Sequence, residues 1–418
     1  MSALAKILSA RGKSVRGSDV AEGEYTASLA AAGIPVCTER DDPALDGCGV
    51  VVYSDAVRPD DAHIVRAVRA GKPLVSRGKL LAALCACYGR TIAVAGCHGK
   101  TTCTAMLAHI FHEAGRSFTA HIGGNDAVFG NCVAEGDDYF ITEACEYKRN
   151  FLLLSPDVAV ILNSDADHLE CYGGAPELVA AYRRFAESSS KCVCLFGDAC
   201  ARGDMTFGME RGADFTASRI SCDGGKYAFD ILFCGRFFCS VSLSVYGRHN
   251  ILNALAAAAA AHVSGVRPEH IASALSAFSG VEGRFQSIGS YNGCEVIADY
   301  AHHPREISAA LRTACLITHG ELYVIFRPHT YSRTKNLFAD FVDVLGKCRH
   351  LLIYKTFAAR EYFDADGSAL RLSQALKNSR YAQSEREIEY FMRGARCGDK
   401  ILVLGAGDIS RIVKGLIS

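Results

Sequence analysis

What this sequence most clearly lacks is an excess of charge of either sign. Lysine and arginine together number 45, aspartate and glutamate also number 45, and the formal net charge is +0 at pH 7. A protein that binds nucleic acid usually carries an excess of basic residues. The balance therefore argues against a nucleic-acid partner.

We also find no run that resembles a signal peptide or a membrane span. The nearest candidate, residues 251–263, is short, rich in alanine and contains His262, which is typical of a tightly packed helix. The 19 cysteines are scattered and lack zinc-site spacing, so we expect reduced structural thiols. Cys192 and Cys194 alternate within an apolar run, as buried strand residues do. These features predict a cytoplasmic protein with no membrane partner.

Only nine prolines occur in the chain, and no Ser/Gly-rich linker separates its parts. Domain limits can therefore be placed only to within about ten residues. The length of 418 residues corresponds to about three domains of roughly 150 residues each. We expect boundaries at 1–88, 89–281 and 282–418.

Short apolar runs alternate with helical patterns in the first and last parts of the chain. This alternation predicts an α/β fold with parallel sheets flanked by helices. The run between residues 215 and 245 differs, because its short alternating segments are typical of antiparallel strands. The other expected strands are 49–53, 72–75, 90–96, 138–143, 158–163, 295–298, 322–326, 351–354 and 400–404, and the expected helices include 1–10, 62–70, 102–114 and an Ala-rich helix from Asn250.

The segment Gly96-Cys97-His98-Gly99-Lys100-Thr101-Thr102 lies between an apolar strand and a helix. Glycines let backbone N–H groups turn toward phosphates, and a helix N-terminus adds the positive end of its dipole. In such a loop Lys100 reaches the β- and γ-phosphates and the Thr101 hydroxyl holds Mg²⁺. The spacing is shorter than in the general pattern, since Val94 stands where the first glycine would be. An ordinary strand–turn–helix junction is the alternative.

Acidic residues follow the next two expected strands. Glu143 ends one, and Asp165, Asp167 and His168 follow the other. Residues just past the carboxyl ends of parallel strands converge on one crevice, where these side chains could hold a divalent metal near the phosphates. A surface loop that carries Asp-x-Asp-His by chance is the alternative.

Polar clusters also stand at the start of the Ala-rich helix and after two later strands. They span residues 247–253, 299–304 and 327–334. Two strand ends dense in histidine and arginine predict an anion-facing crevice in the last domain. The alternative for adjacent histidines is a helix cap with one buried ring.

Taken in order, these segments resemble the Mur ligase family, and within it the branch that adds alanine. The resemblance runs from Met1 to Ile409. Its most specific stretches are residues 96–102, 143–146, 167–168, 249–254, 299–304 and 328–334. It implies a Rossmann-like N-terminal domain, a central P-loop ATPase domain and a Rossmann-like C-terminal domain.

The resemblance further implies a reaction. ATP phosphorylates the lactyl carboxylate of UDP-N-acetylmuramate, the amine of L-alanine attacks the acyl phosphate, and an amide and phosphate result. This is a step of peptidoglycan precursor synthesis in the cytoplasm, with ATP and Mg²⁺ as cofactors. It requires charge neutralisation more than covalent help from the protein. The implied protein is a monomer or weak homodimer.

The family's functional positions can be carried over one by one. Lys100 would hold the transferring phosphate, and Asn163 would line the same pocket. The metal ligands would be Thr101, Glu143 and His168. ATP would contact Gly96, Cys97, His98, Gly99, Thr102, His249, Asn253, Arg284 and Asp299; the sugar nucleotide and alanine would contact Ser54, Arg77, Glu146, Tyr300, His302, His329 and Arg333.

The sequence departs from the family in places. Family members carry a strand and a Gly-x-Gly-Gly-x-Gly turn before the Met-Ser that opens the first helix, whereas here Met1 and Ser2 begin the sequence. We therefore expect the first strand of the UDP-binding domain to be missing, either through a start assigned late or through a truncation that weakens UDP-sugar binding. Gly283 replaces an arginine, and Cys145 and Tyr147 replace an aspartate and a serine.

Two other functions stay open at this point. A related ligase attaches a tripeptide to the same sugar nucleotide and shares the ATP site. A truncated homologue could bind nucleotide without turnover. A redox role for Cys97, which lies inside the phosphate loop, is a further hypothesis. The alternative is that this side chain is inert.

We predict that Lys100→Ala abolishes ATP-dependent phosphate release, because it removes the positive charge that stabilises the transferring phosphoryl group. Phosphate release by the variant and by the wild type measures the effect. Near-normal turnover in the variant would contradict the assignment of this loop.

Overall fold

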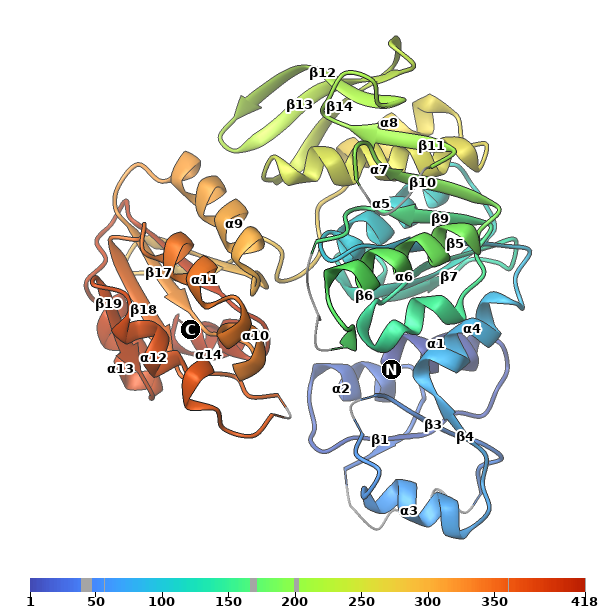
Figure 1. Ribbon diagram of the computed structural model, residues 1–418, viewed down its shortest axis with the longest axis horizontal. Coiled ribbons are helices and arrows are strands. Elements are labelled where there is room, and N and C mark those ends of the chain that lie inside the picture. The colour runs from blue at the N-terminus through green and yellow to red at the C-terminus, as the bar shows by residue number, and fades with distance from the viewer. Residues whose placement is uncertain (39–46, 56, 166–170, 199–202, 360, 418) are drawn as a thin grey trace. The chain divides into compact units, whose positions relative to one another are not determined.

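The computed structural model describes residues 1–418 except 39–46, 56, 166–170, 199–202, 360 and 418 (Figure 1). Helices and strands alternate along most of the described chain and the larger sheets are mainly parallel, which confirms the predicted α/β fold class. The chain divides into two compact units. One comprises Met1–Arg219, Phe229–Val241 and Leu252–Phe278, and the other comprises Ile220–Ala228, Ser242–Ile251 and Ser279–Ser418.

The N-terminal region alternates helices with short strands, as predicted. Its strands form two separate parallel pairs, β1 with β2 and β3 with β4, whereas we expected one parallel sheet. Two pairs form one sheet only if a strand of one pairs with a strand of the other or a further strand hydrogen-bonds to both, and neither occurs among the described residues. The elements are α1 (Ser2–Ala10), β1 (Gly17–Ser18), α2 (Glu24–Ala31), β2 (Val36–Cys37), β3 (Val51–Tyr53), α3 (Ala62–Arg69), β4 (Leu74–Ser76) and α4 (Arg77–Cys85).

Helix α1 is anchored by its apolar side. Leu4 and Ile7 lie one turn apart on the same face, and each is 1% exposed. They pack in one hydrophobic cluster with Leu81 and Leu84 of α4 and with Phe140 of the central sheet. The N-terminal region thus shares a core with the central region.

The central sheet has ten strands in the order β14-β13-β12-β11-β10-β9-β5-β8-β6-β7. Its middle is parallel, and Ile92 to Ala95 of β5 are completely buried, because helices cover both faces of such sheets. Strands β5, β8 and β9 agree with the prediction, while β6, β7 and β11 were not anticipated. The strands are β5 (Arg90–Ala95), β6 (Phe118–Asp126), β7 (Gly130–Ala134), β8 (Tyr139–Glu143), β9 (Val158–Ile161), β10 (Lys191–Leu195), β11 (Met205–Gly208), β12 (Phe215–Asp223), β13 (Lys226–Phe233) and β14 (Arg236–Tyr246).

Two expectations for buried segments are confirmed. Cys192 and Cys194 are buried on β10. The alanine run Ala256–Ala261 of α7 is fully buried, and the His262 ring that follows it lies 4.8 Å from the ring of Phe233. The helices of this region are α5 (Lys100–Glu113), the 3₁₀ segment η2 (Tyr147–Leu153), α6 (Ala175–Glu187), α7 (His249–Val263) and α8 (Pro268–Ala277).

The C-terminal sheet has six strands in the order β15-β16-β20-β17-β18-β19, of which only β15 is antiparallel to its neighbour. One apolar cluster covers each face. The four predicted strands are β16, β17, β18 and β20, and the short edge strands β15 and β19 were missed. The strands are β15 (Gln286–Tyr291), β16 (Cys294–Asp299), β17 (Leu322–Phe326), β18 (His350–Tyr354), β19 (Ser379–Ala382) and β20 (Lys400–Leu404).

Helices of the C-terminal region connect these strands. In the described part of the chain, no helix has the length and apolarity needed to cross a membrane. The elements are α9 (Pro304–Ile317), α10 (Tyr331–Asn336), α11 (Phe338–Leu345), η4 (Ala365–Gly367), α12 (Ala369–Gln374), α13 (Glu385–Met392) and α14 (Ile409–Ile417).

A buried carboxylate ties helix α5 to the turn between β6 and β7. Asp126 is 4% exposed and accepts hydrogen bonds from the backbone N–H groups of Val128 (2.9 Å) and Phe129 (3.0 Å). His109 of α5 places Nε2 3.0 Å from the same carboxylate. Burial opposes ionisation of Asp126, but the hydrogen bonds from His109, Phe129 and Val128 outweigh it and lower the pKa of this carboxyl.

Asp126→Asn should therefore lower the free energy of unfolding by about 1–3 kcal/mol at pH 7. Because the folded-state pKa is lowered, the contribution of the carboxylate is present above its unfolded-state pKa and is lost as the pH falls through the folded-state value. Urea unfolding should show the difference between wild type and variant shrinking below about pH 4.

Asp137→Asn is the matched control, since Asp137 forms an exposed ion pair with Arg11 at 2.7 Å. Such pairs contribute less than about 1 kcal/mol. Equal losses in the two variants would contradict a special role for Asp126.

Candidate active site

The predicted phosphate loop connects β5 to α5, in the strand–loop–helix context that was expected. Gly96 and Gly99 adopt φ values of 138° and 85°, which residues with a side chain rarely adopt. A Cβ on Gly96 would lie 3.0 Å from Leu162 Cβ, and one on Gly99 would lie against the side-chain oxygen of Asn253. The first turn of α5, with Thr101 and Thr102 buried, has N–H groups without intrahelical acceptors. The loop therefore presents backbone donors at a helix N-terminus.

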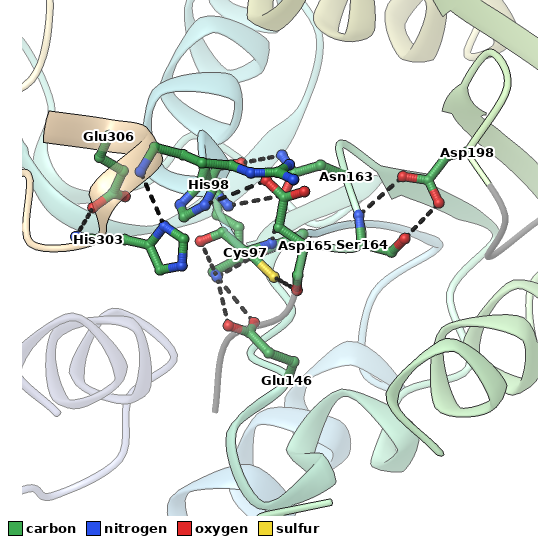
Figure 2. Close-up of polar contacts among 12 residues, drawn as sticks. Cys97, His98, Glu146, Asn163, Ser164, Asp165, Asp198, His303 and Glu306 are labelled. Carbon is green, nitrogen blue, oxygen red and sulfur yellow. Dashed lines mark hydrogen bonds and ion pairs between the residues drawn. The ribbon is translucent and has the colours of Figure 1, made fainter. Parts of the chain in front are cut away.

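Asn163 braces this loop from the end of β9 (Figure 2). Its side-chain oxygen accepts hydrogen bonds from the N–H groups of Cys97 (2.9 Å) and His98 (3.1 Å), and its amide nitrogen donates to the His98 carbonyl (3.0 Å). The Cys97 thiol donates to the carbonyl of Asp165 at 2.5 Å. Asn163 was predicted to line the pocket, and the structure places it as a support of the loop.

Lys100 forms a buried ion pair with Glu146. Its Nζ lies 2.9 and 3.1 Å from the two carboxylate oxygens, 2.5 Å from the Gly96 carbonyl and 3.3 Å from the Cys97 carbonyl. Figure 2 shows the Glu146 carboxylate turned toward the loop. The side chains are 16% and 2% exposed. Burial by itself lowers the pKa of Lys100, but the charge of Glu146, with smaller contributions from Cys145 and Cys97, outweighs it and raises the pKa.

The segment after Glu146 is held in an uncommon conformation. Lys148 and Arg149 both have positive φ, 50° and 60°, although neither is glycine. The Tyr172 hydroxyl donates to the Glu146 carbonyl at 2.5 Å, and Arg149 lies over the Tyr172 ring at 5.2 Å. Strained backbone of this kind persists only where surrounding contacts enforce it, and it is concentrated at functional sites.

Two of the three predicted metal ligands lie at or just after the ends of strands that are neighbours in the central sheet. Glu143 ends β8, pairs with Val94 of β5 in the sheet register, and accepts a hydrogen bond from the Gly123 N–H at 2.6 Å. Thr101 follows β5 in the first turn of α5. Their oxygen atoms are of the type that Mg²⁺ prefers. The third predicted ligand, His168, lies outside the described residues, as does Asp167. Within the described ranges, no three His, Cys, Asp or Glu side chains cluster closely enough to hold a metal ion.

Arg77, a predicted substrate contact, begins α4 and lies 3.2 Å from His121 Nε2. Burial and the charge of Arg77 lower the pKa of His121 to about 3, so this imidazole is neutral. His121 Nδ1 also lies 2.9 Å from the Thr142 hydroxyl. Ser54 follows β3, and the next residue, Asp55, accepts a hydrogen bond from Asn150 at 2.8 Å.

Asn253 and His249, both predicted ATP contacts, lie on α7. Asn253 is 7% exposed, and its side-chain oxygen packs against Gly99. His249 is the first residue of the helix.

In the C-terminal sheet, β16 and β17 lie on either side of β20, and the polar clusters that follow these two strands leave the same edge of the sheet, as expected. Asp299 accepts hydrogen bonds from the N–H groups of Phe285 (3.0 Å) and Ala301 (2.7 Å). Burial raises the pKa of Asp299 to about 6, against the opposing charge of Arg284. Arg284 in turn lies over the Tyr300 ring at 5.1 Å.

His302, His329 and Arg333 are brought together. The two imidazole rings are 5.5 Å apart, and Arg333, 8% exposed, places Nη1 2.9 Å from His329 Nδ1. Phe357 stacks on His329 with ring centroids 5.5 Å apart. Glu361 accepts hydrogen bonds from the Ser332 N–H (2.9 Å) and hydroxyl, and so fixes the first turn of α10.

Sequence reasoning missed several of these groups. His121, Asn150, Phe357 and Glu361 belong to no motif that we recognised. For His121, a polar residue within a buried strand was the available signal. The other three had none, because their importance lies in contacts with distant segments.

The comparisons with known proteins agree with this architecture. The Mur ligase family, catalytic domain, matches residues 1–88, the Mur ligase middle domain matches 94–261, and the Mur ligase, glutamate ligase domain, matches 283–407. The chain belongs to the Mur ligase family.

Particular relatives share nearly the whole length. The chain is 36% identical to a UDP-N-acetylmuramate–L-alanine ligase of Clostridium acetobutylicum, covering 100% of this chain and 95% of the relative. The solved UDP-N-acetylmuramate–alanine ligase of Thermotoga maritima matches with a TM-score of 0.86 and 28% identity over 100% of this chain and 95% of that one. A murein peptide ligase of Psychrobacter arcticus matches with a TM-score of 0.77 and 25% identity over the same shares.

Gly99→Ala should disable the loop, because the new Cβ would lie against the side-chain oxygen of Asn253, a buried residue with little room to move. A displacement of about 1 Å at such a site costs about 100-fold in turnover. Gly115→Ala is the matched control at the other end of α5. It has φ 60° and nothing within 4 Å of its Cβ, so it should carry similar backbone strain without loss of turnover. Equal turnover of the two variants would contradict the role of the Gly99–Asn253 contact.

Proposed function

We propose that this chain ligates L-alanine to the lactyl carboxylate of UDP-N-acetylmuramate at the expense of ATP. Similarity over the full length to UDP-N-acetylmuramate–L-alanine ligases carries the proposal. The phosphate loop with its buried Lys100 supports it, because phosphoryl transfer requires a fixed cation beside the γ-phosphate.

In this reaction a carboxylate oxygen attacks the γ-phosphorus and ADP leaves, which gives an acyl phosphate. The amine of L-alanine then attacks the acyl carbon, the carbon–oxygen bond to phosphate breaks, and the amide forms. We assign Lys100 to the transferring phosphate. Asn163 acts as a positioning residue, because it holds the N–H groups of Cys97 and His98 in place.

We assign Mg²⁺ to Thr101 and Glu143, with His168 as a further ligand. Their donor set suits the ion, since two of them supply oxygen. When bound, Mg²⁺ neutralises charge on the phosphates and on the attacking carboxylate. The Glu143 side chain is held for this role by its hydrogen bond from Gly123.

The remaining residues have roles that we assign by family position and local geometry. Residues 1–88 would bind the UDP moiety with Ser54 and Arg77, and 89–281 would bind ATP through the loop and Asn253. Residues 282–418 would supply Arg284 and Asp299 to ATP, and Tyr300, His302, His329 and Arg333 to the substrates. The His329–Arg333 pair suits a carboxylate, because a buried guanidinium binds such groups well.

A phosphate-release assay with UDP-N-acetylmuramate and ATP tests the proposal. L-alanine should stimulate release and a tripeptide should not, while Lys100→Ala serves as the inactive control. Stimulation by the tripeptide alone would favour the peptide-adding ligase. Nucleotide binding without turnover on either substrate would mean a binding protein.

A further inference from the structure

The ammonium group of Lys100 has all of its hydrogen-bond donors in use before any phosphate arrives. Its three donors face the carbonyls of Gly96 and Cys97 and the carboxylate of Glu146. Of these acceptors, only Glu146 carries charge. A phosphate that takes Lys100 therefore competes with Glu146 for the ammonium group and weakens this ion pair.

Glu146 then needs another cation. Its side chain is 2% exposed, and among the described residues Lys100 is the only cation within ion-pair distance of it. The surrounding groups, Cys145, Tyr172 and Tyr182, are neutral. Burial is the largest cause that raises the pKa of each group, and the charge of Glu146 raises it further. A buried carboxylate that loses its only partner is strongly destabilised.

The carboxylate also cannot follow Lys100 by a movement of the main chain. The Tyr172 hydroxyl holds the Glu146 carbonyl, and the Arg149 N–H donates to the same carbonyl at 2.9 Å. The positive φ values of Lys148 and Arg149 fix the following turn. Glu146 therefore stays beside the place where the γ-phosphate, and then the acyl phosphate, would lie.

We propose that Glu146 binds the ammonium group of the incoming amino acid in place of Lys100 and accepts a proton from it. This inference rests on the proposed function. The resting partner of Glu146 is already a primary ammonium at 2.9 Å, so the pocket is shaped for R–NH₃⁺. Mg²⁺ is the other possible cation, but the proposed function already assigns it to Thr101 and Glu143, at the start of α5 and the end of β8.

The proton balance is complete. The ammonium gives one proton to the Glu146 carboxylate and becomes an amine, whose lone pair forms the bond to the acyl carbon. As the tetrahedral intermediate collapses, the bond to phosphate breaks and phosphate leaves with the electron pair. The nitrogen loses its second proton, and this proton and the one on Glu146 pass to the departing phosphate.

Glu146→Gln tests this role, because it keeps the shape of the side chain and removes its charge. Hydroxylamine serves as a second nucleophile, since it is uncharged at neutral pH and needs no base to trap an acyl phosphate as a hydroxamate. With UDP-N-acetylmuramate and ATP, the variant should ligate L-alanine about 100-fold more slowly, with a raised KM for L-alanine. Hydroxamate formation should stay near the wild-type rate. MgADP should bind the variant no more weakly than the wild type, because the neutral side chain no longer pairs with Lys100.

Glu187→Gln, at an exposed position of α6, is the matched control and should behave as wild type in every assay. Equal losses with L-alanine and hydroxylamine would overturn the proposal and place Glu146 with the phosphates or the metal. Unchanged ligation of L-alanine in Glu146→Gln would also overturn it.

Two further outcomes are separable. If Glu146→Gln binds no nucleotide, Glu146→Asp gives the same comparison, because it keeps the charge but shortens the reach. It should raise the KM for L-alanine and leave hydroxamate formation unchanged, and the opposite pattern would overturn the proposal. Failure of the wild type itself to use L-alanine would refute the proposed function instead.

Discussion

The candidate active site depends on the hydrogen bonding of one strand, β5, to both β8 and β9. The register places Val94 beside Glu143 and Ala95 beside Ile161. Since parallel strands end at one edge, the phosphate loop, Glu143 and Asn163 emerge together. A shift of register by one residue would turn the side chains of a strand to the opposite face. The position of the site is therefore set first by strand pairing in the sheet and only then by the conformation of its loops.

The C-terminal sheet repeats this logic with a different polar set. Asp299 and Phe326 both pair with Leu404 of the strand between them, so the segments that follow β16 and β17 leave one edge. Asp299 is then occupied by two backbone N–H groups, and His329 is enclosed by Phe357 and Arg333. Much of this cluster is therefore already ordered by its own contacts, which reduces the entropy lost when a ligand binds.

The part of the site that the sequence predicted most fully is the part encoded locally. An apolar strand, two glycines, Lys100 and a helix are consecutive, so their chemistry can be read without knowledge of the fold. The Lys100–Glu146 pair could not be foreseen, although Glu146 was named, because 46 residues separate the partners and no motif states their distance. Glu361 and Asn150 were missed for the same reason. The two separate strand pairs of the N-terminal region also differ from the expected sheet, since strand propensity does not specify which strands pair.

The support that Asn163 gives to the loop has a consequence for the chemical lifetime of the protein. Its amide group uses one oxygen to accept two hydrogen bonds and its nitrogen to donate a third. Hydrolysis of the amide, the slow deamidation to which asparagine is prone, would replace the donor with a second acceptor facing the His98 carbonyl. It would also place a negative charge beside a loop built for anions. A single spontaneous deamidation at this residue would therefore disrupt the phosphate loop while the rest of the fold stays intact.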